Sequence, residues 1–274
     1  MVSSLYSSSS SQRGINLFNT STKAVNQSFA ILASGSRFTS ASVDAASQAI
    51  AAELEQSTVR LSRASQNIGD ATSMLNIADG AVSQIQDLGG RLQELAVQSA
   101  NGLYSDEQRA VLQDEFNSIT QEIQRITETT EFNGQQLLSG EGFSVQVGTD
   151  GSAQSALAVG GFSVTGDLAT LTSVDISTQA GAQSAIQSIR DFSQSVSAQR
   201  SDVIGTTYSR LTSIDNGIQT QLQAERESLA RVSDADIASE SANLVQNTIR
   251  MQLGAALLGK DSSTQAGAIL NLLA

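Results

Sequence analysis

The hydrophobic residues between positions 61 and 96 recur at steps of three and four without a break. This heptad spacing is typical of a helix that buries one narrow stripe against neighbouring helices. It predicts a long helix from about residue 51 to residue 100, which would measure about 70 Å at 1.5 Å per residue. The stripe consists of Leu61, Ala64, Ile68, Ala71, Leu75, Ala78, Val82, Ile85, Gly89, Leu92 and Ala96.

Two more helices are predicted to pack along this stripe. Asn101-Gly102 indicates a turn, and Ser105 with Gln108 has the spacing of a capping box, so the second helix should form an antiparallel hairpin with the first. Helical spacing resumes near residue 177 and continues to 232. We expect this third helix to return along the hairpin and to complete a left-handed three-helix bundle.

The intervening segment has a different pattern. Short alternating runs of apolar residues are separated by Asp150-Gly151 and Gly160-Gly161, which are turn signals. The pattern predicts two β-hairpins that form a small subdomain at the far end of the rod. The apolar positions of the segment are Phe143, Val145, Val147, Leu157, Val159, Phe162, Val164, Leu168, Leu171, Val174 and Ile176.

Both ends of the chain carry amphipathic helical patterns. The first ends at Ser34-Gly35 and follows a Ser-rich stretch, residues 1–12, that we expect to be a flexible lead. The last is predicted to be capped by Ser233-Asp234. We expect these two arms to be disordered or frayed until they dock, and to pair in one coaxial two-helix domain. Their apolar positions are Ile15, Phe18, Val25, Phe29, Leu32, Leu244, Met251, Leu258 and Leu272.

The sequence thus predicts a mainly α chain, a long antiparallel bundle with a small β-hairpin subdomain at one end and a paired set of terminal helices. Its five segments are the N-terminal arm (1–41), the two rod helices (42–138), the β subdomain (139–176), the returning rod helix (177–232) and the C-terminal arm (233–274).

Composition narrows the function classes. The 274 residues include no Pro, His, Cys or Trp. Lack of Pro suits unbroken helices, and lack of His and Cys excludes imidazole acid–base chemistry, thiol nucleophiles and the usual zinc and iron–sulfur sites. No convergent acid, base and nucleophile can be assembled from the remaining residues, so we expect no enzyme, no catalytic residue, no cofactor and no metal site.

Charge and hydropathy bear on partners. A net charge of −12 with no basic stripe argues against nucleic acid, and no run of 18 apolar residues indicates a membrane span. The start of the chain has no cleavable Sec-type signal pattern, so secretion would have to use another route.

Residues 254–260 spell most of a phosphate-binding loop, but Asp261 replaces the expected Ser or Thr, and small residues for close helix packing explain the pattern better. Asp234 and Asp236 are likewise better explained by an acidic, capped helix start than by a metal.

Several ordered stretches resemble the bacterial flagellins. The most recognisable is residues 92–102, and Phe132-Asn133-Gly134 follows it as in that family. The other matching stretches are residues 32–35 with Arg37, Ala41 and residues 44–46; Asn67, Asp70 and Ala71; residues 232–236 with Ala238 and Glu240; and residues 269–273. The Ser-rich start, the absence of proline at residues 262–265 and the short segment 139–175 depart from the family pattern. The short segment predicts a thin filament without decorations.

The resemblance implies a structural subunit of the extracellular flagellar filament, which copies of the chain build for motility by polymerising through their terminal helices. The arm residues Ile15, Phe18, Val25, Phe29, Leu32, Leu244, Met251, Leu258 and Leu272 would form the inner tube. The implied partners are further copies of the chain, a flagellar export chaperone, the filament cap and the hook-junction proteins, with export through the flagellum's own type III apparatus.

The resemblance also implies recognition by Toll-like receptor 5 through Arg91, Leu95 and Glu115. Arg91 and Leu95 are four residues apart and should share one helix face. The alternative is that the two charges are solvated or make contacts between subunits and that Leu95 serves packing. For the whole chain, a hook-associated junction protein and a secreted coiled-coil adhesin remain the alternative functions.

Overall fold

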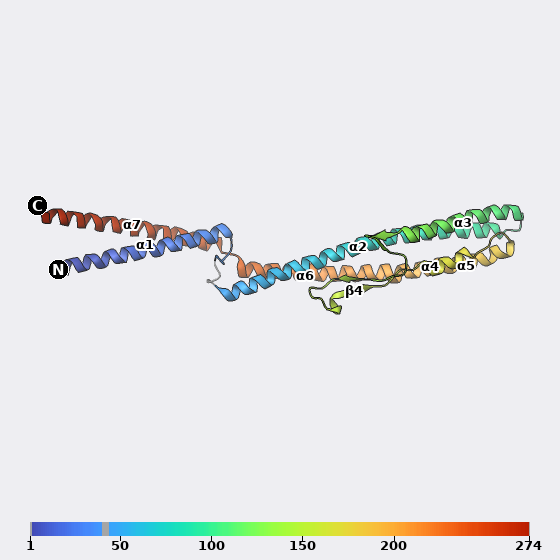
Figure 1. Ribbon diagram of the computed structural model, residues 1–274, viewed down its shortest axis with the longest axis horizontal. Coiled ribbons are helices and arrows are strands. Elements are labelled where there is room, and N and C mark those ends of the chain that lie inside the picture. Colours follow the sequence, from blue (N-terminus) through green and yellow to red (C-terminus); the bar gives the residue numbers. More distant parts are fainter. Residues whose placement is uncertain (1, 40–43, 274) are drawn as a thin grey trace. The chain divides into compact units, whose positions relative to one another are not determined.

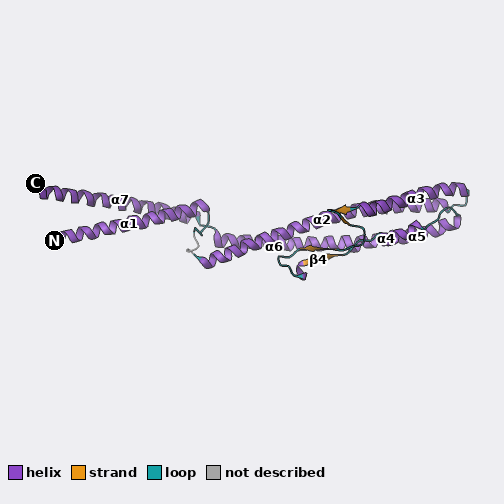
Figure 2. Ribbon diagram, viewed as in Figure 1, coloured by secondary structure: helices purple, strands orange, loops and turns teal. Residues whose placement is uncertain are grey.

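The computed structural model describes residues 2–39 and 44–273, with side chains for 12–39 and 44–259. The mainly α prediction is confirmed (Figure 2). The helices are α1 (Val2–Ser34), α2 (Ala45–Ser99), α3 (Asp106–Thr129), α4 (Thr165–Thr172), α5 (Gln179–Gln199), α6 (Thr206–Ser233) and α7 (Ile237–Leu273). The strands are β1 (Glu131–Phe132), β2 (Gln135–Gln136), β3 (Phe143–Gln146) and β4 (Ala156–Val159), and two short turns of other helix types are η1 (Ala153–Ser155) and η2 (Arg200–Gly205).

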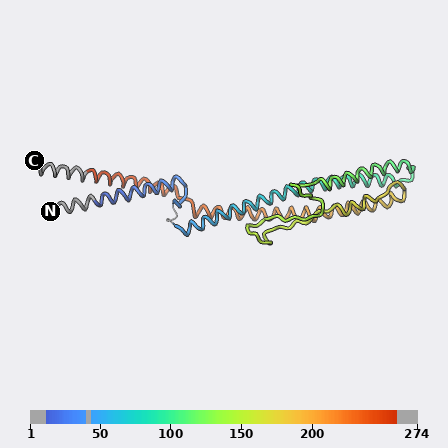
Figure 3. Tube along the Cα trace, in the orientation of Figure 1, coloured from blue at the N-terminus to red at the C-terminus, as the bar shows by residue number. Residues whose placement is uncertain are grey.

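The chain divides into two compact units. The terminal unit comprises residues 1–56 and 224–274, and the central unit comprises residues 57–223. Helices α2 and α6 each contribute residues to both units. The Cα trace in Figure 3 lets the chain be followed from one unit to the other and back.

The core of the central unit is the predicted stripe of α2. All eleven of its positions are buried, and Val82, Ile85 and Leu92 are fully so. They pack against α3 and the α5–α6 segment, whose own seams bury residues such as Phe116, Ile189 and Leu211. The antiparallel hairpin of α2 and α3 is present, and Ser105 and Gln108 form the predicted capping box.

The returning helix is continuous but changes its winding once. Between α5 and α6 the six residues of η2 are π-helical. Arg200, the first of them, donates from Nε and Nη2 to the two carboxylate oxygens of Asp79 on α2 at 2.6 and 2.8 Å. These hydrogen bonds and the guanidinium charge lower the pKa of Asp79 below its ordinary value. Because both side chains are more than one-third exposed, the pair fixes the alignment of the helices more than it adds stability.

The β segment differs from its prediction in two respects. The first hairpin is present as β3 and β4, in antiparallel register from Phe143 opposite Val159 to Gln146 opposite Ala156, with Asp150-Gly151 in the connection. The second predicted hairpin is wrong, because Leu168 and Leu171 lie in α4. Leu168 follows Val164 by four residues and Leu171 follows Leu168 by three, which is helical spacing that the sequence analysis had grouped with the alternating strands.

The position of the hairpin is the second difference. Its strand β3 packs on the side of α2, where Asn67 Nδ2 donates to the Gln146 carbonyl at 2.9 Å and Met74 and Phe143 line one groove. Figure 1 shows β4 alongside the helices of this unit. The end of the central unit is formed instead by the α2–α3 turn. A further two-residue hairpin, β1–β2, turns at Asn133-Gly134, both of which have positive φ (51° and 79°).

The termini of the long helices also correct two predictions. Residues 2–12 are helical, not a flexible lead, since α1 begins at Val2. No Pro or Gly precedes Gly14, and a helix extends at little cost once a turn exists.

The cap of α7 is Asp236, not Ser233-Asp234, because Asp236 Oδ1 accepts from the backbone N–H of Ala238 and Ser239. The predicted stop at Gly35 is confirmed, with φ 68°. Asp44 caps α2 by accepting from the backbone N–H of Ser47; Ser42, whose residue type also suits a cap, lies outside the described residues.

Candidate assembly surfaces

Helices α1 and α7 form an antiparallel pair in the terminal unit (Figure 1). Two glycines fix how closely they approach. A Cβ built on Gly14 would lie 3.1 Å from Leu258 Cδ2, and one built on Gly254 would lie 3.3 Å from the backbone N and Cα of Phe18. The phosphate-loop-like pattern at residues 254–260 is therefore explained at Gly254 by close helix packing, as the sequence favoured.

Each layer of this pair sets a small or polar residue against a large one. The register defined by Gly14 with Leu258 and Phe18 with Gly254 places the buried Ser21 opposite Met251 and the buried Ser28 opposite Leu244. Such alternation lets two backbones approach closely while the large side chains fill the gaps. The seam of α1 is accordingly Gly14, Phe18, Ser21, Val25, Ser28 and Leu32, and that of α7 is Leu244, Asn247, Met251, Gly254 and Leu258.

The predicted arm residues separate into two groups. Six lie on the intramolecular seam and are partly buried there, namely Phe18, Val25, Leu32, Leu244, Met251 and Leu258. Ile15 and Phe29 lie beside the seam, with 40% and 66% of their surface exposed. Leu272 belongs to α7, but its side chain lies outside the described residues.

A second apolar set on α7 was missed by sequence reasoning. Val245, Ile249, Leu253 and Leu257 are each between 51% and 59% exposed in the isolated chain. They recur every four residues, one register away from the seam residues. This second four-residue repeat was the sequence signal for a second apolar face on α7. It was difficult to recognise because the seam residues of the same helix are also apolar.

The chain segments that enter and leave this pair are tied together. Ser36 and Asp234 form an isolated antiparallel bridge. Arg37 N donates to the Ser233 carbonyl at 2.8 Å, and Ala235 N donates to the Gly35 carbonyl at 3.0 Å. These backbone hydrogen bonds fix the base of the α1–α7 pair, where α1 ends and α7 begins.

The three predicted receptor residues do not share an exposed surface. Arg91 donates from Nη2 to Glu115 Oε1 at 2.8 Å and from Nη1 to Glu94 Oε2 at 2.9 Å. The side chains of Arg91 and Glu115 are about half exposed, at 49% and 44%. Hydrogen bonds to Glu115 and Glu94 raise the pKa of Arg91 above its ordinary value. Leu95 is 0% exposed. Leu95 is therefore not accessible beside Arg91, because it points into the bundle, and this burial agrees with the alternative that Leu95 serves packing.

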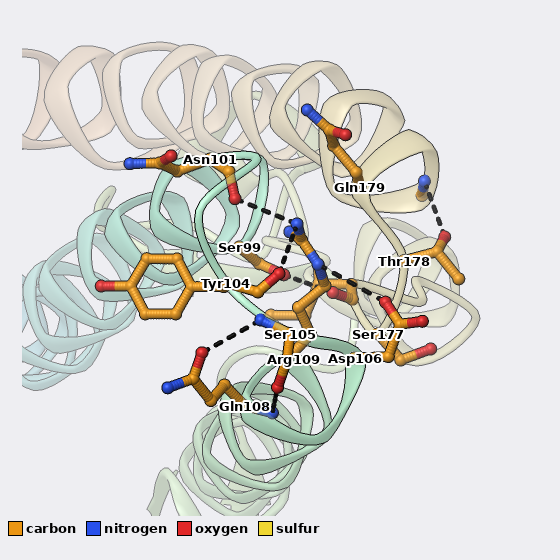
Figure 4. A network of polar contacts seen from close by, with 12 residues as sticks. Ser99, Asn101, Tyr104, Ser105, Asp106, Gln108, Arg109, Ser177, Thr178 and Gln179 are labelled. Carbon is orange, nitrogen blue, oxygen red and sulfur yellow. Dashed lines mark hydrogen bonds and ion pairs between the residues drawn. The ribbon is translucent and has the colours of Figure 1, made fainter.

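The end of the central unit is held by a polar network (Figure 4). The buried Arg109 donates from Nη2 to the carbonyls of Asn101 and Tyr104 at 3.0 and 3.2 Å, which satisfies acceptors just beyond the C-terminus of α2. Ser99 Oγ donates to the Ile176 carbonyl and ties this end to the segment before α5. The network holds a turn that presents Leu103, 89% exposed, to solvent.

The described residues offer no site of two other kinds. Within residues 2–39 and 44–273, no helix is long and apolar enough to cross a membrane. Among residues 12–39 and 44–259, whose side chains are described, no group of three or more His, Cys, Asp or Glu could hold a metal ion.

Comparisons with known proteins agree on one family. Residues 2–142 match the model of the bacterial flagellin N-terminal helical region, and residues 174–273 match that of the bacterial flagellin C-terminal helical region. The chain is 33% identical to a flagellin of Halalkalibacterium halodurans over 95% of this chain and 94% of that one. It is 29% identical to a flagellar filament 30.7 kDa core protein of Treponema maltophilum, over 88% and 90% of the two chains.

Solved structures show the same fold. The crystal structure of Bacillus cereus flagellin aligns with a TM-score of 0.50 and 24% identity, over 56% of this chain and 88% of that one. A putative flagellar hook-associated protein from Vibrio parahaemolyticus aligns with a TM-score of 0.59 and 15% identity, over 70% and 100%. At these identities the likeness concerns the fold alone.

Gly254→Leu should separate α1 from α7. Its side chain would meet the Phe18 backbone, which cannot move aside as a side-chain tip can, and we expect a loss of about 1–3 kcal/mol in the stability of the pair. Amide hydrogen exchange of α1 in the monomer should accelerate accordingly. Gly259→Leu is the matched control, because a Cβ there meets nothing within 4 Å. Equal exchange in both variants would contradict the close approach at Gly254.

Proposed function

Because the chain belongs to the bacterial flagellin family and is therefore a structural subunit of the flagellar filament, we propose that its terminal helices α1 and α7 carry the polymerisation. The members of this family are structural proteins that assemble with copies of themselves. A structural subunit needs no catalytic imidazole or thiol, and the chain contains neither His nor Cys.

One observation carries this proposal. The terminal pair leaves large apolar side chains exposed on both helices, among them Phe29 on α1 and Ile249 and Leu253 on α7. In the central unit, by contrast, the seam of α2 is fully covered by helices of the same chain. Exposed apolar surface of this kind favours association, and unlike patches that meet head to tail build an open helical polymer.

Removal of residues 266–274 should abolish assembly while leaving a largely helical monomer. The deletion shortens α7 by about 13 Å and removes four of its large apolar residues. Sedimentation and negative-stain electron microscopy after heating to monomers and slow cooling would measure the outcome. Asn271→Gln in the full chain keeps those apolar residues and should assemble normally. Normal filaments from the shortened chain would refute a role for this end of α7.

We further propose export through the flagellum's own type III apparatus, without a cleaved Sec signal, with an export chaperone, the filament cap and hook-junction proteins as partners. The basis is membership of the flagellin family. In a strain with an inactivated flagellar export apparatus, the chain should accumulate inside the cell with its N-terminus uncut. Secretion that continues in that strain would exclude this route.

Recognition by Toll-like receptor 5 is a separate proposal that rests on Arg91 and Glu115. Both are accessible on the α2–α3 face, whereas Leu95 could contribute only by supporting α2 from within. Arg91→Ala should weaken binding of the monomer to the receptor ectodomain by about ten-fold, the scale of a charge-assisted hydrogen bond. Arg125→Ala is the matched control, since Arg125 is also an exposed arginine paired with a glutamate. Equal affinities of the two variants would exclude Arg91 from the receptor contact.

The alternatives are less well supported. The full-length relatives described above are a flagellin and a filament core protein. The hook-associated protein shares the fold at 15% identity, so a junction role has no support beyond architecture.

A further inference from the structure

The chain contains three Asn-Gly pairs, and each lies in a different backbone environment: Asn101-Gly102, Asn133-Gly134 and Asn216-Gly217. An Asn followed by Gly can lose its side-chain amide without an enzyme, because glycine leaves the next backbone nitrogen unhindered. The residues of all three pairs are exposed, so access to solvent does not distinguish them. The backbone conformation and the hydrogen bonds around each pair do distinguish them.

Asn133 and Gly134 are the two loop residues of the β1–β2 hairpin, since Phe132 pairs with Gln135. Their φ angles of 51° and 79° are those of a tight turn in which both loop residues are left-handed. Within the described part of the chain, Asn133 is the one residue other than glycine with positive φ. Each strand is only two residues long, so little cross-strand pairing resists rotation of the Asn133 backbone.

The reacting groups of this pair are free to move. No hydrogen bond joins the Asn133 carboxamide or the Gly134 N–H to any residue that the structure describes. A Cβ built on Gly134 would meet nothing within 4 Å. The Gly134 nitrogen and the Asn133 side-chain carbon can therefore approach each other without breaking a hydrogen bond of either group.

The other two pairs are held by their surroundings. Asn101 Oδ1 accepts from the backbone N–H of Leu103 at 3.1 Å, and the Asn101 carbonyl accepts from Arg109 Nη2 at 3.0 Å (Figure 4). Gly217 lies inside α6, where backbone N–H groups donate to carbonyls four residues earlier. At both places a local opening must precede attack by the glycine nitrogen.

We propose that Asn133 is a site of spontaneous deamidation, selected among the three pairs by the open β1–β2 turn. The Gly134 nitrogen loses its proton to hydroxide and attacks Asn133 Cγ. A C–N bond forms, the side-chain amide takes up a proton from water and leaves as ammonia, and a succinimide ring results. Water then opens the ring at one of its two carbonyls, which gives aspartate or isoaspartate. This chemistry lies outside the proposed assembly function and does not depend on it.

The two products change the turn in different ways. Aspartate adds a negative charge to a groove that Asp70 also lines. Isoaspartate adds one methylene group to the backbone, and a two-residue loop cannot take up that atom while Phe132 stays opposite Gln135. The isoaspartyl form should therefore lose the β1–β2 pairing, which faster amide hydrogen exchange of residues 131–136 would show.

Tryptic peptides allow a direct test, because residues 92–109, 126–190 and 211–226 each form one peptide with a single Asn. Mass spectrometry of the full-length monomer in mildly alkaline buffer would follow the conversion of amide to acid. Asn133 should convert at least about ten-fold faster than Asn101 or Asn216, since those two must first open locally. In denaturant the three rates should become similar, because each pair then has only its Asn-Gly sequence.

Matched variants identify the source of the ammonia. Asn133→Gln should remove most of the ammonia that the folded chain releases, because attack on the longer side chain has to close a larger and less favourable ring. Asn216→Gln should leave the release unchanged.

Equal rates at Asn133 and Asn216 in the folded chain would overturn the assignment. An excess at Asn133 that persists unchanged in denaturant would overturn it as well, because the selection would then not come from the turn.

Discussion

A helix whose apolar residues form a stripe is stable in water only when another helix covers that stripe. This constraint governs both units of the chain and distinguishes them. In the central unit α3 and the α5–α6 segment cover the stripe of α2 so completely that Val82, Ile85 and Leu92 have no exposed surface. In the terminal unit α1 and α7 cover one face of each other and leave large apolar residues in solvent. The stripe of α2 is thus covered within one chain, whereas the exposed apolar residues of α1 and α7 are available to other chains.

Close approach of backbones lets a chain with few aromatic residues pack its helices tightly. Gly14 and Gly254 accept Leu258 and Phe18 in the terminal pair, where an added Cβ would lie only 3.1 and 3.3 Å from atoms of these residues. A glycine in a helix costs up to about 1 kcal/mol relative to alanine, so its use at these positions is explained by the large side chain opposite. Apolar seams alone would permit several registers between neighbouring helices. Ion pairs such as Asp79 with Arg200 select one of these registers.

Charge complements this division of labour. The acidic residues are concentrated outside α1 and α7. The helix surfaces of the central unit therefore remain hydrated, and those of two copies repel each other. The same distribution leaves the terminal pair as the part of the chain where copies meet with the least electrostatic cost. The proposed association through α1 and α7 therefore agrees with the distribution of charge along the chain.

Much of the architecture followed from spacing alone. The α2 stripe, the α2–α3 hairpin, the capping box at Ser105 and the stop at Gly35 were predicted because each depends on contacts within a few residues or on one repeated period. The sequence did not indicate that β3 and β4 lie along α2, or that η2 winds as a π-helix. Those features depend on partners distant in the chain, such as Asn67 for Gln146 and Asp79 for Arg200.

The candidate surfaces show the same boundary. The sequence by itself determined the family, the helical arms and the set of apolar residues from which any assembly contact must be drawn, because periodicity and composition are properties of the chain alone. Only the tertiary structure decided which of those residues are already covered. Leu95 is buried by the bundle, Met251 and Leu258 face α1, and Ile249 and Leu253 face solvent. Neighbouring positions on one helix differ in burial because the opposite helix determines which of them are covered. The register of that opposite helix cannot be read from the local sequence.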